Sequence, residues 1–354
     1  MADDGESTSM PATKRHTVTT ADKCRFLSDP DNYPHPPAEV RVEETHMSFV
    51  FLAGPRVFKL KKPVRYPFLD FSTLKAREHF VKEEIRLNRR LAPDVYLGTM
   101  PLSLTPDGRL FLGFGDEVVD WLVTMRRLPE ERMLDRLILK GALTPDMVEG
   151  LADTLCRFFE SAPAEHPDPT AYTERYAREH AVTCSILLDP ALGFDGEKVG
   201  PALTRFKHGF EEVRPLIEAR VRDGRIIEGH GDLRPEHVCL NRPAAIIDCL
   251  EFKRDLRLLD PFEEIAFLGL ECARLGADWV FHVLYKRCAQ CLGKPPPPAV
   301  TVFYWRYRAL LRARLTLAHL LEPEPRIPEK WAPLTWRYIA LAERNAAQII
   351  PSDG

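Results

Sequence analysis

One short segment constrains this chain more than any other part of its sequence. It opens with the polar stretch His230-Gly-Asp-Leu-Arg-Pro-Glu-His237, and it ends with Asp248-Cys-Leu-Glu-Phe252. Between them, two apolar runs flank a turn at Asn241-Arg-Pro243, a pattern that predicts two short strands. One aspartate, Asp232, is therefore expected on a polar loop, and the other, Asp248, at the end of a buried strand.

Two aspartates in this arrangement suit phosphoryl transfer from a metal-bound nucleotide. One carboxylate can orient or deprotonate an attacking hydroxyl, while the other holds the divalent ion that neutralises charge on the phosphate. A His-x-Asp triplet alone is a weak signal, because such residues often only satisfy the backbone of a surface loop. The strands that follow it favour the catalytic interpretation. Two roles stay open for Glu251, as an ion ligand or as a turn cap, whereas Asp260 is expected to tie down the following loop.

The pattern along the chain indicates three parts. Residues 1–30 are expected to be a flexible N-terminal tail, because the chain begins with an acidic stretch rich in small residues. Residues 31–125 are rich in strands, with a hairpin at 46–62 and a helix from about 73 to 91. Residues 126–354 are mainly helical. This change in pattern predicts a lobe boundary near residue 126.

Prolines and glycines mark the ends of the predicted helices. Thr144-Pro145 predicts a helix start, with threonine as N-cap and proline in the first turn. Two long helices are expected at about 261–292 and 302–321. The run Gly293-Lys-Pro-Pro-Pro-Pro298 separates them, because it cannot lie inside a helix. A second proline-rich loop, 322–333, precedes a last helix.

Composition narrows the class of protein. A chain of 354 residues suggests two domains or one two-lobed domain, and its net charge of −3 gives no global reason to expect nucleic acid or an anionic membrane as partner. There is no apolar run of about 20 residues and no secretory signal at the start, so a cytoplasmic protein that does not span a membrane is expected. The aromatic and basic residues 303–308 are interpreted as core packing with arginines at its edge, not as a nucleic-acid surface.

The eight cysteines are scattered through the chain. This pattern suits reduced thiols in the core better than a disulfide framework. The pair Cys288-Ala-Gln-Cys291 has no second pair and no histidine at ligand spacing, so it is interpreted as two small residues on a helix. The cysteines that fall within apolar patterns are Cys156, Cys239, Cys249 and Cys272.

A lysine on the predicted hairpin and a glutamate on the predicted helix form a second candidate set. Strand alternation puts Val57, Lys59 and Lys61 on one face, and Lys59 lies nearest the apolar run. On the helix, Glu84 interrupts an apolar stripe, where a carboxylate is costly unless it is paired. Glu83 points about 100° away. The pair Lys59–Glu84 is therefore predicted, with two solvated side chains as the alternative.

These residues resemble the aminoglycoside phosphotransferase and choline kinase group of the protein-kinase-like fold, and an uncharacterised bacterial branch within it. The resemblance spans about residues 40–320. It is carried by the His-Gly-Asp-Leu motif, by Val57-Phe-Lys-Leu-Lys-Lys-Pro-Val64, by Phe68-Leu-Asp-Phe-Ser-Thr73 and by Arg86-Leu-Asn-Arg-Arg-Leu-Ala-Pro93. It implies an α+β, two-lobed fold with an antiparallel sheet in the N-lobe and a mainly helical C-lobe. It also implies ATP and Mg²⁺ as cofactors.

The resemblance further implies roles for residues of the N-lobe. Lys59 would bind the α- and β-phosphates of ATP and would be held by Glu84. Val57 would pack on the adenine base. Val123 and Met125 would belong to the hinge between the lobes, beside the base.

In the C-lobe the resemblance implies the transfer machinery. Asp232 would orient or deprotonate the acceptor hydroxyl, and Asp248 would bind Mg²⁺. The Asp-Leu-Arg-Pro-Glu run is also similar to the Asp-Leu-Lys-Pro-Glu of protein kinases, which would let Arg234 steady the γ-phosphate. His237 stands where the family carries asparagine. Because Mg²⁺ prefers oxygen ligands, a second metal site that included His237 would tilt the preference toward Mn²⁺.

The acceptor class follows from what comes after the motif. Protein kinases place a long activation segment there, ending in Ala-Pro-Glu, whereas here a helical pattern begins about a dozen residues after Asp248. A small-molecule acceptor is therefore favoured over a protein side chain; for a cationic acceptor, Glu263 and Glu264 are candidate pocket residues. A nucleotide-binding regulatory module is the alternative, because a glycine-rich phosphate loop is absent and His237 departs from the family. The identity of the acceptor and the oligomeric state do not follow from the sequence.

Overall fold

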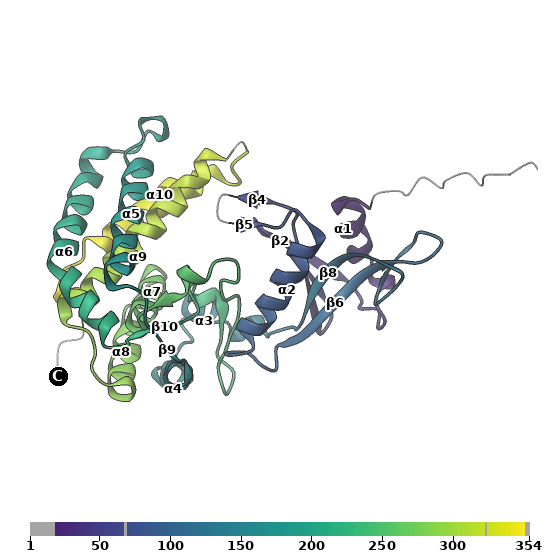
Figure 1. Ribbon diagram of the computed structural model, residues 1–354, viewed down its shortest axis with the longest axis horizontal. Coiled ribbons are helices and arrows are strands. Elements are labelled where there is room, and N and C mark those ends of the chain that lie inside the picture. Colours follow the sequence, from purple (N-terminus) through teal and green to yellow (C-terminus); the bar gives the residue numbers. More distant parts are fainter. Residues whose placement is uncertain (1–17, 67–68, 323, 351–354) are drawn as a thin grey trace, which may run out of the picture. The chain divides into compact units, whose positions relative to one another are not determined.

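A computed structural model describes residues 18–66, 69–322 and 324–350 of the chain. The chain forms two units (Figure 1). The first comprises residues up to Lys82 together with Leu97–Arg127, and the second comprises Glu83–Tyr96 and the chain from Leu128 onward. Residues 83–96, which the sequence pattern groups with the strand-rich part, thus belong to the helical unit.

The first unit is built on a six-stranded, curled antiparallel sheet with the order β1-β2-β3-β8-β6-β7. The predicted hairpin is confirmed, since β2 and β3 pair across a turn at Gly54, whose φ of 57° favours glycine. A two-stranded sheet of β4 and β5 lies outside the main sheet. The strands are β1 (Val40–Glu44), β2 (Ser48–Ala53), β3 (Arg56–Lys61), β4 (Arg65–Tyr66), β5 (Leu69–Asp70), β6 (Tyr96–Leu104), β7 (Leu110–Leu112) and β8 (Glu117–Arg126).

Helix α1 (Thr20–Ser28) lies within the segment that was expected to be a flexible tail, and that expectation is wrong for these residues. A capping box between Thr19 and Asp22 starts the helix. Leu27 is fully buried in the same core as Phe58 and Leu60 of the sheet. The apolar side of α1 thus gains the burial that a solvated tail would lack. Residues 1–17 of the predicted tail lie outside the described part of the chain.

A buried carboxylate links the helices of the first unit to the sheet. Asp120 of β8 accepts a hydrogen bond from the Lys23 ammonium of α1 at 2.8 Å and one from Arg77 Nε at 2.8 Å. Arg77 lies on α2 (Leu74–Asn88), the helix predicted from about 73 to 91. Both cations are almost fully buried with Asp120, so this triad holds α1 and the first turns of α2 against β8.

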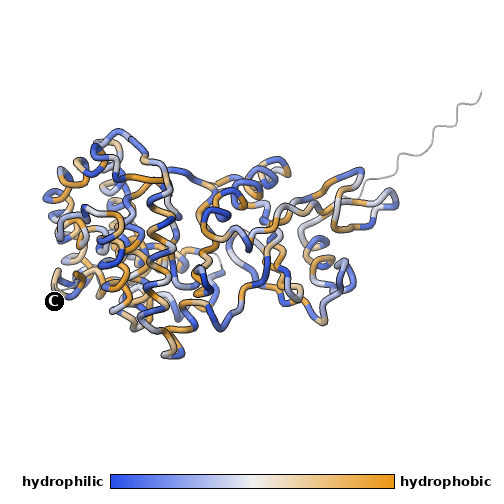
Figure 2. Tube along the Cα trace, turned by 90° about the horizontal axis from the view of Figure 1, so that it is seen from below, coloured by the Kyte–Doolittle hydropathy of each residue, from blue (hydrophilic) through white to orange (hydrophobic). Residues whose placement is uncertain are grey.

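The second unit is mainly helical, as expected, and apolar and polar residues alternate along its trace (Figure 2). Its buried apolar residues form one core cluster. Its loops are connected by short strands. These are β9 (Ala164–Glu165), β10 (Ile226–Glu228), β11 (Val238–Cys239), β12 (Ala245–Ile246) and β13 (Leu258–Leu259). Its helices are α3 (Leu134–Leu139), α4 (Pro145–Ser161), α5 (Pro169–Leu187), α6 (Gly196–Arg222), α7 (Pro261–Arg274), α8 (Trp279–Leu292), α9 (Pro298–Ala318), α10 (Trp331–Ala342) and α11 (Ala346–Ile349).

The single long helix predicted at 261–292 is wrong. It is two helices, α7 and α8, because Gly276 adopts a φ of 93° that ends the first helix and turns the chain. The turn lets α8 fold back on α7, where Gly269 leaves room for the Phe281 ring. A Cβ atom at position 269 would lie 2.5 Å from that ring. Thr144 takes the predicted N-cap position of α4, but its side chain makes no capping hydrogen bond.

Two further sequence interpretations are decided by packing. Phe303, Tyr304 and Trp305 of α9 are buried in the core, as predicted. Cys156 is not a reduced thiol, because it forms a disulfide with Cys291 of the CxxC pair. In the part of the chain that the structure describes, none of the helices has both the length and the apolar character that a bilayer crossing requires.

Candidate active site

Four of the predicted nucleotide-binding residues lie together on one face of the sheet of the first unit. In the β3–β8 pair, Val57 is opposite Met125 and Lys59 is opposite Val123. Directly opposed residues of an antiparallel pair share a face, so these side chains form a single patch. Val57, Val123 and Met125 are buried in it, while Lys59 is partly exposed. The predicted alternation along β3 is confirmed, since Phe58 and Leu60 point into the core instead.

Lys61 is a candidate that sequence reasoning passed over. It lies on the same face as Lys59, but only 1% of it is exposed, and its ammonium group lies 5.0 Å from the centre of the Phe71 ring. Proximity to the apolar run had favoured Lys59 as the lysine held inside a cleft. Burial is instead greater for Lys61, whose ammonium group packs over the Phe71 ring just after β5. Both lysines are therefore candidates for phosphate binding.

Glu84 is fully buried on α2, as its place in an apolar stripe predicts. Glu83 points elsewhere, and its carboxylate lies 2.6 Å from Arg86 and 3.7 Å from Arg257. Glu84 belongs to the second unit and Lys59 to the first, so their pairing stays a prediction.

The His230-Gly-Asp loop follows β10 and is held by a buried carboxylate. Glu264 of α7 accepts hydrogen bonds from the backbone N–H groups of His230 at 2.8 Å and Gly231 at 2.5 Å. Glycine is needed on both sides of His230. A Cβ atom at Gly229 would lie 2.7 Å from the Glu264 carboxylate, and Gly231 has a φ of 84°. The loop is thus shaped by backbone contacts that a bulkier sequence could not make.

His230 is a structural residue that ties this loop to the second one. Its ring is fully buried; Nε2–H donates to the carbonyl of Ile247 at 2.9 Å, and Nδ1 accepts from the N–H of Asp232 at 3.3 Å. Burial lowers the pKa of His230 to about 4. The ring is therefore neutral at physiological pH, which is the state that this pair of hydrogen bonds requires.

Asp232 is held in place by Arg234. The guanidinium donates to Oδ2 of Asp232 from Nε at 3.1 Å and contacts Glu236 at 2.9 Å. Burial alone would raise the pKa of Asp232, but the positive charge nearby, with Arg234 as its largest contributor, outweighs that effect and lowers it. Asp232 is thus an ionised carboxylate with a fixed orientation, able to accept a hydrogen bond from a hydroxyl group.

His237 connects the two aspartates. Its Nδ1–H donates to the carbonyl oxygen of Asp232 at 2.9 Å, so Nε2 carries the lone pair. Nε2 lies 3.1 Å from a guanidinium nitrogen of Arg234 and 3.5 Å from Oδ2 of Asp248. Neighbouring ligands of an octahedral ion at about 2.1 Å are about 3 Å apart, so Asp248 and His237 fit a divalent cation. Arg234 competes for the same lone pair, which disfavours His237 relative to Asp248 as a ligand.

Asp248 follows the predicted hairpin of β11 and β12, which is confirmed. Its φ of 64° is unusual for a residue with a side chain and turns the carboxylate out of the strand direction. Two residues that sequence reasoning missed fix this turn. The Tyr96 hydroxyl accepts from the N–H of Asp248 at 3.1 Å, and the Asn88 side chain accepts from the N–H of Cys249 at 2.9 Å.

A third missed residue, Arg90, supports the loop from the other side. Its guanidinium donates to the carbonyl groups of Glu228 at 2.7 Å and Gly229 at 2.8 Å, just before His230. Asn88 and Arg90 both belong to the block Arg86–Pro93 that carried the sequence resemblance. The block therefore binds the backbone beside both aspartates, at Cys249 next to Asp248 and at Gly229 before His230.

The acidic residues considered for a cationic acceptor are used inside the protein. Glu263 is fully buried with Arg308 at 2.7 Å and Arg175 at 2.8 Å, and Glu264 binds the loop backbone. The hypothesis that they line a pocket is therefore wrong.

A further arginine, Arg312, contributes positive charge at Asp232. Its charge lowers the pKa of the Asp232 carboxyl group. Glu271 is fully buried and binds three partners on α7, α9 and α10: Arg274, Arg312 and Tyr338.

Comparison with solved structures identifies the fold. A choline/ethanolamine kinase family protein from Mesorhizobium loti superposes with a TM-score of 0.53 over 92% of this chain and 98% of that one, at 16% identity. This chain has a protein-kinase-like fold. In that fold the curled sheet of the first unit precedes the mainly helical region, as the sequence predicted. An aminoglycoside phosphotransferase, APH(4)-Ia, in ternary complex with AMP-PNP and hygromycin B, is a weaker match with a TM-score of 0.47 and 12% identity over 90% of this chain and 96% of that one.

The sequence relatives of this chain do not indicate its function, because they are themselves uncharacterised. No protein-family model matches the chain. Uncharacterised proteins from Mycobacterium bovis and Mycobacterium tuberculosis are 32% identical over 292 residues, which cover 81% of this chain and 56% of each relative. The chain therefore spans little more than half the length of the curated relatives it matches.

Proposed function

We propose that this kinase-like protein is an ATP-dependent phosphotransferase that moves the γ-phosphate to a hydroxyl group of a small molecule. One observation carries the proposal: an ionised Asp232, oriented by Arg234, lies on the same buried framework as Asp248, and His237 links the two. This constellation supplies a proton acceptor and a metal ligand on neighbouring loops. Those are the parts that in-line phosphoryl transfer requires of the protein.

In the proposed reaction, Asp232 accepts a hydrogen bond from the acceptor hydroxyl and orients its oxygen toward the γ-phosphorus. As the new P–O bond forms and the bond to ADP breaks, the hydroxyl proton passes to Asp232. Arg234 offers guanidinium N–H groups to the γ-phosphate. Asp248, with His237 beside it, would hold Mg²⁺ or Mn²⁺, whose charge would offset that of the phosphates.

The patch on the sheet of the first unit is proposed as the nucleotide site. Val57 would contact the base, Val123 and Met125 would flank it, and Lys59 or Lys61 would bind the phosphates. Glu84 is proposed as the carboxylate that positions the lysine. The support is that these apolar side chains and both lysines occupy neighbouring positions on one face.

Charge near Asp232 indicates the kind of acceptor. A choline-like or aminoglycoside-like cation needs an accessible carboxylate, yet Glu263 and Glu264 are used internally and Glu271 is occupied by two arginines and a tyrosine. We therefore infer that a cationic acceptor would not be held by Glu263, Glu264 or Glu271.

The test is a screen for phosphate transfer from ATP with Mg²⁺ or Mn²⁺, using hydroxylated metabolites of each charge class, aminoglycosides and choline. The expected result is ADP formation that depends on one acceptor class and is lost in Asp248→Asn but kept in Asp255→Asn, an exposed control on a neighbouring turn. A phosphorylated macromolecule in place of a small product would instead identify a protein kinase.

A nucleotide-binding regulatory module is the second candidate, because Arg234 contacts the one residue, His237, that departs from the family pattern. ATP affinity measured with and without Mg²⁺ separates the two. Metal-independent binding without turnover across the whole acceptor panel would favour the module.

A further inference from the structure

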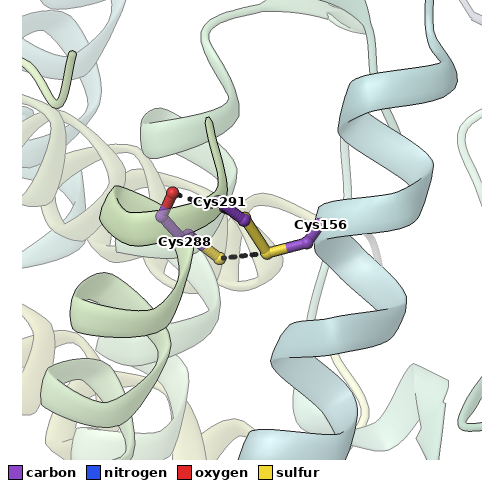
Figure 3. Close-up of side chains that lie close together, drawn as sticks. All are labelled: Cys156, Cys288 and Cys291. Atoms are coloured by element: carbon purple, nitrogen blue, oxygen red, sulfur yellow. Dashed lines mark hydrogen bonds between the residues drawn. A yellow bond between two sulfur atoms is a disulfide. The ribbon is translucent and has the colours of Figure 1, made fainter. Parts of the chain in front are cut away.

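Three cysteines of the second unit form a cluster apart from the residues proposed for phosphate transfer. Cys156 of α4 is joined to Cys291 of α8, and Cys288 lies one turn earlier on α8 (Figure 3). The sulfur atoms of Cys156 and Cys288 are 3.9 Å apart, and all three sulfurs lie within 4.8 Å of one another. The Cys288 thiol therefore lies beside both sulfur atoms of the disulfide, where thiol–disulfide exchange can occur.

The three cysteines differ in how far each residue is buried. Cys156 and Cys288 are buried, whereas Cys291 is partly exposed and lines a cavity of about 210 Å³. The apolar part of the wall includes Phe159, Phe262 and Leu292. A small thiol that enters this cavity therefore meets Cys291 first.

The cavity wall also carries charge. Arg220 is committed to an ion pair with Asp260, but the Arg225 guanidinium has no hydrogen bond or ion pair with any residue in the described ranges. Glu160 is the one acidic residue on the lining, and it is exposed. With Arg220 neutralised by Asp260, Arg225 is the guanidinium on this lining that is left to pair with an anionic ligand.

We propose that the Cys156–Cys291 disulfide is a modification site at which a small anionic thiol, entering through this cavity, forms a mixed disulfide with Cys291. The thiolate attacks Sγ of Cys291, the bond between Cys291 and Cys156 breaks, and Cys156 leaves with the electron pair and takes up a proton. No oxidant is consumed, because one disulfide replaces another.

Cys288 is the cysteine that resolves this intermediate. Its thiolate attacks Sγ of Cys291 and expels the small thiol, which leaves a disulfide between Cys288 and Cys291 within α8. The net result frees α4 from its covalent link to α8. Burial raises the pKa of Cys288 to about 12, so the second step is slow at neutral pH and the mixed disulfide accumulates first.

The test treats the oxidised 354-residue chain with three thiols of similar size: 2-mercaptoethanesulfonate, 2-mercaptoethanol and cysteamine. Adducts and disulfide pairs are mapped by mass spectrometry of non-reduced peptides. The expected result is an adduct confined to Cys291, which forms about threefold to tenfold faster with the anionic thiol than with the cationic one, after correction for the thiolate fraction of each reagent. In Arg225→Gln this preference disappears.

One variant, Cys288→Ser, separates resolution from simple reduction. In Cys288→Ser the Cys291 adduct persists, whereas in the wild type it gives way to the Cys288–Cys291 pair, and faster as the pH rises. The proposal is overturned if the oxidised protein has no Cys156–Cys291 pair, if the adduct forms on Cys156, or if all three thiols react alike with the wild type and Arg225→Gln. It is also overturned if the cluster is isolated with a bound soft metal such as Zn²⁺ on three thiolates. Circular dichroism of each variant reports whether it has folded.

Discussion

The neutral, buried His230 predicts how the stability of the second unit depends on pH. Burial lowers the folded-state pKa to about 4, against 6.5 for an ordinary histidine. Between about pH 6.5 and 4, the unfolded chain therefore binds a proton at His230 that the folded chain does not bind. The contribution of His230 to the free energy of unfolding is therefore greatest above about pH 6.5. It decreases as the pH falls from 6.5 to 4, and it does not change further below that. At 1.36 kcal/mol per pH unit of difference, the full loss is about 3 kcal/mol.

The assay is urea unfolding between pH 4 and 7.5, followed by circular dichroism. His230→Asn keeps a polar group at the site but removes the titration, so it is expected to be less stable at pH 7 and to show a shallower fall toward acid. His208→Asn, at an exposed position on α6, is the control and should retain the wild-type slope. Equal slopes for the wild type and His230→Asn would refute the assignment of a neutral, buried ring.

Three other predictions test the framework and the nucleotide patch. Glu264→Ala leaves two buried backbone N–H groups without their acceptor and is expected to cost about 2–6 kcal/mol in urea unfolding; a loss below about 0.5 kcal/mol would contradict the contacts described for it. Tyr96→Phe removes the acceptor for the N–H of Asp248 and should lower stability by about 1 kcal/mol, with weaker Mg²⁺-dependent ATP binding in calorimetry. Lys59→Met and Lys61→Met, compared by the same calorimetry, identify the phosphate-binding lysine as the one whose loss weakens ATP binding more than AMP binding. If both substitutions weaken ATP binding and AMP binding equally, the patch is not the nucleotide site.

Local patterns made much of the fold predictable. The period-two alternation along β3 is enough to separate Phe58 and Leu60 from Val57 and Lys59, and a turn between two apolar runs is enough to predict the β11–β12 hairpin. The register that sets Val57 opposite Met125 could not be predicted, because it depends on pairing between strands far apart in the chain. Burial of Lys61 in preference to Lys59 was missed for a different reason, because it depends on the side chain of Phe71, a contact that the period of a strand does not indicate.

The residues that support the site were missed for a related reason. Asn88 and Cys249 are 161 positions apart, and Tyr96 and Asp248 are 152 apart, so no local spacing indicates either contact. Cys156 and Cys291 are 135 positions apart, and their pairing depends on how α4 packs against α8. By contrast, the break at Gly276 follows a local rule, since a glycine in a helical pattern can mark a helix end.

The most direct test of the central claim is the rate of phosphate transfer to a responsive acceptor by Asp232→Asn. Asparagine keeps the shape of the side chain but cannot accept the hydroxyl proton, so transfer is expected to fall by about 10²–10⁴ while ATP affinity stays within about threefold of the wild type. An unchanged transfer rate in a folded Asp232→Asn variant would contradict the account.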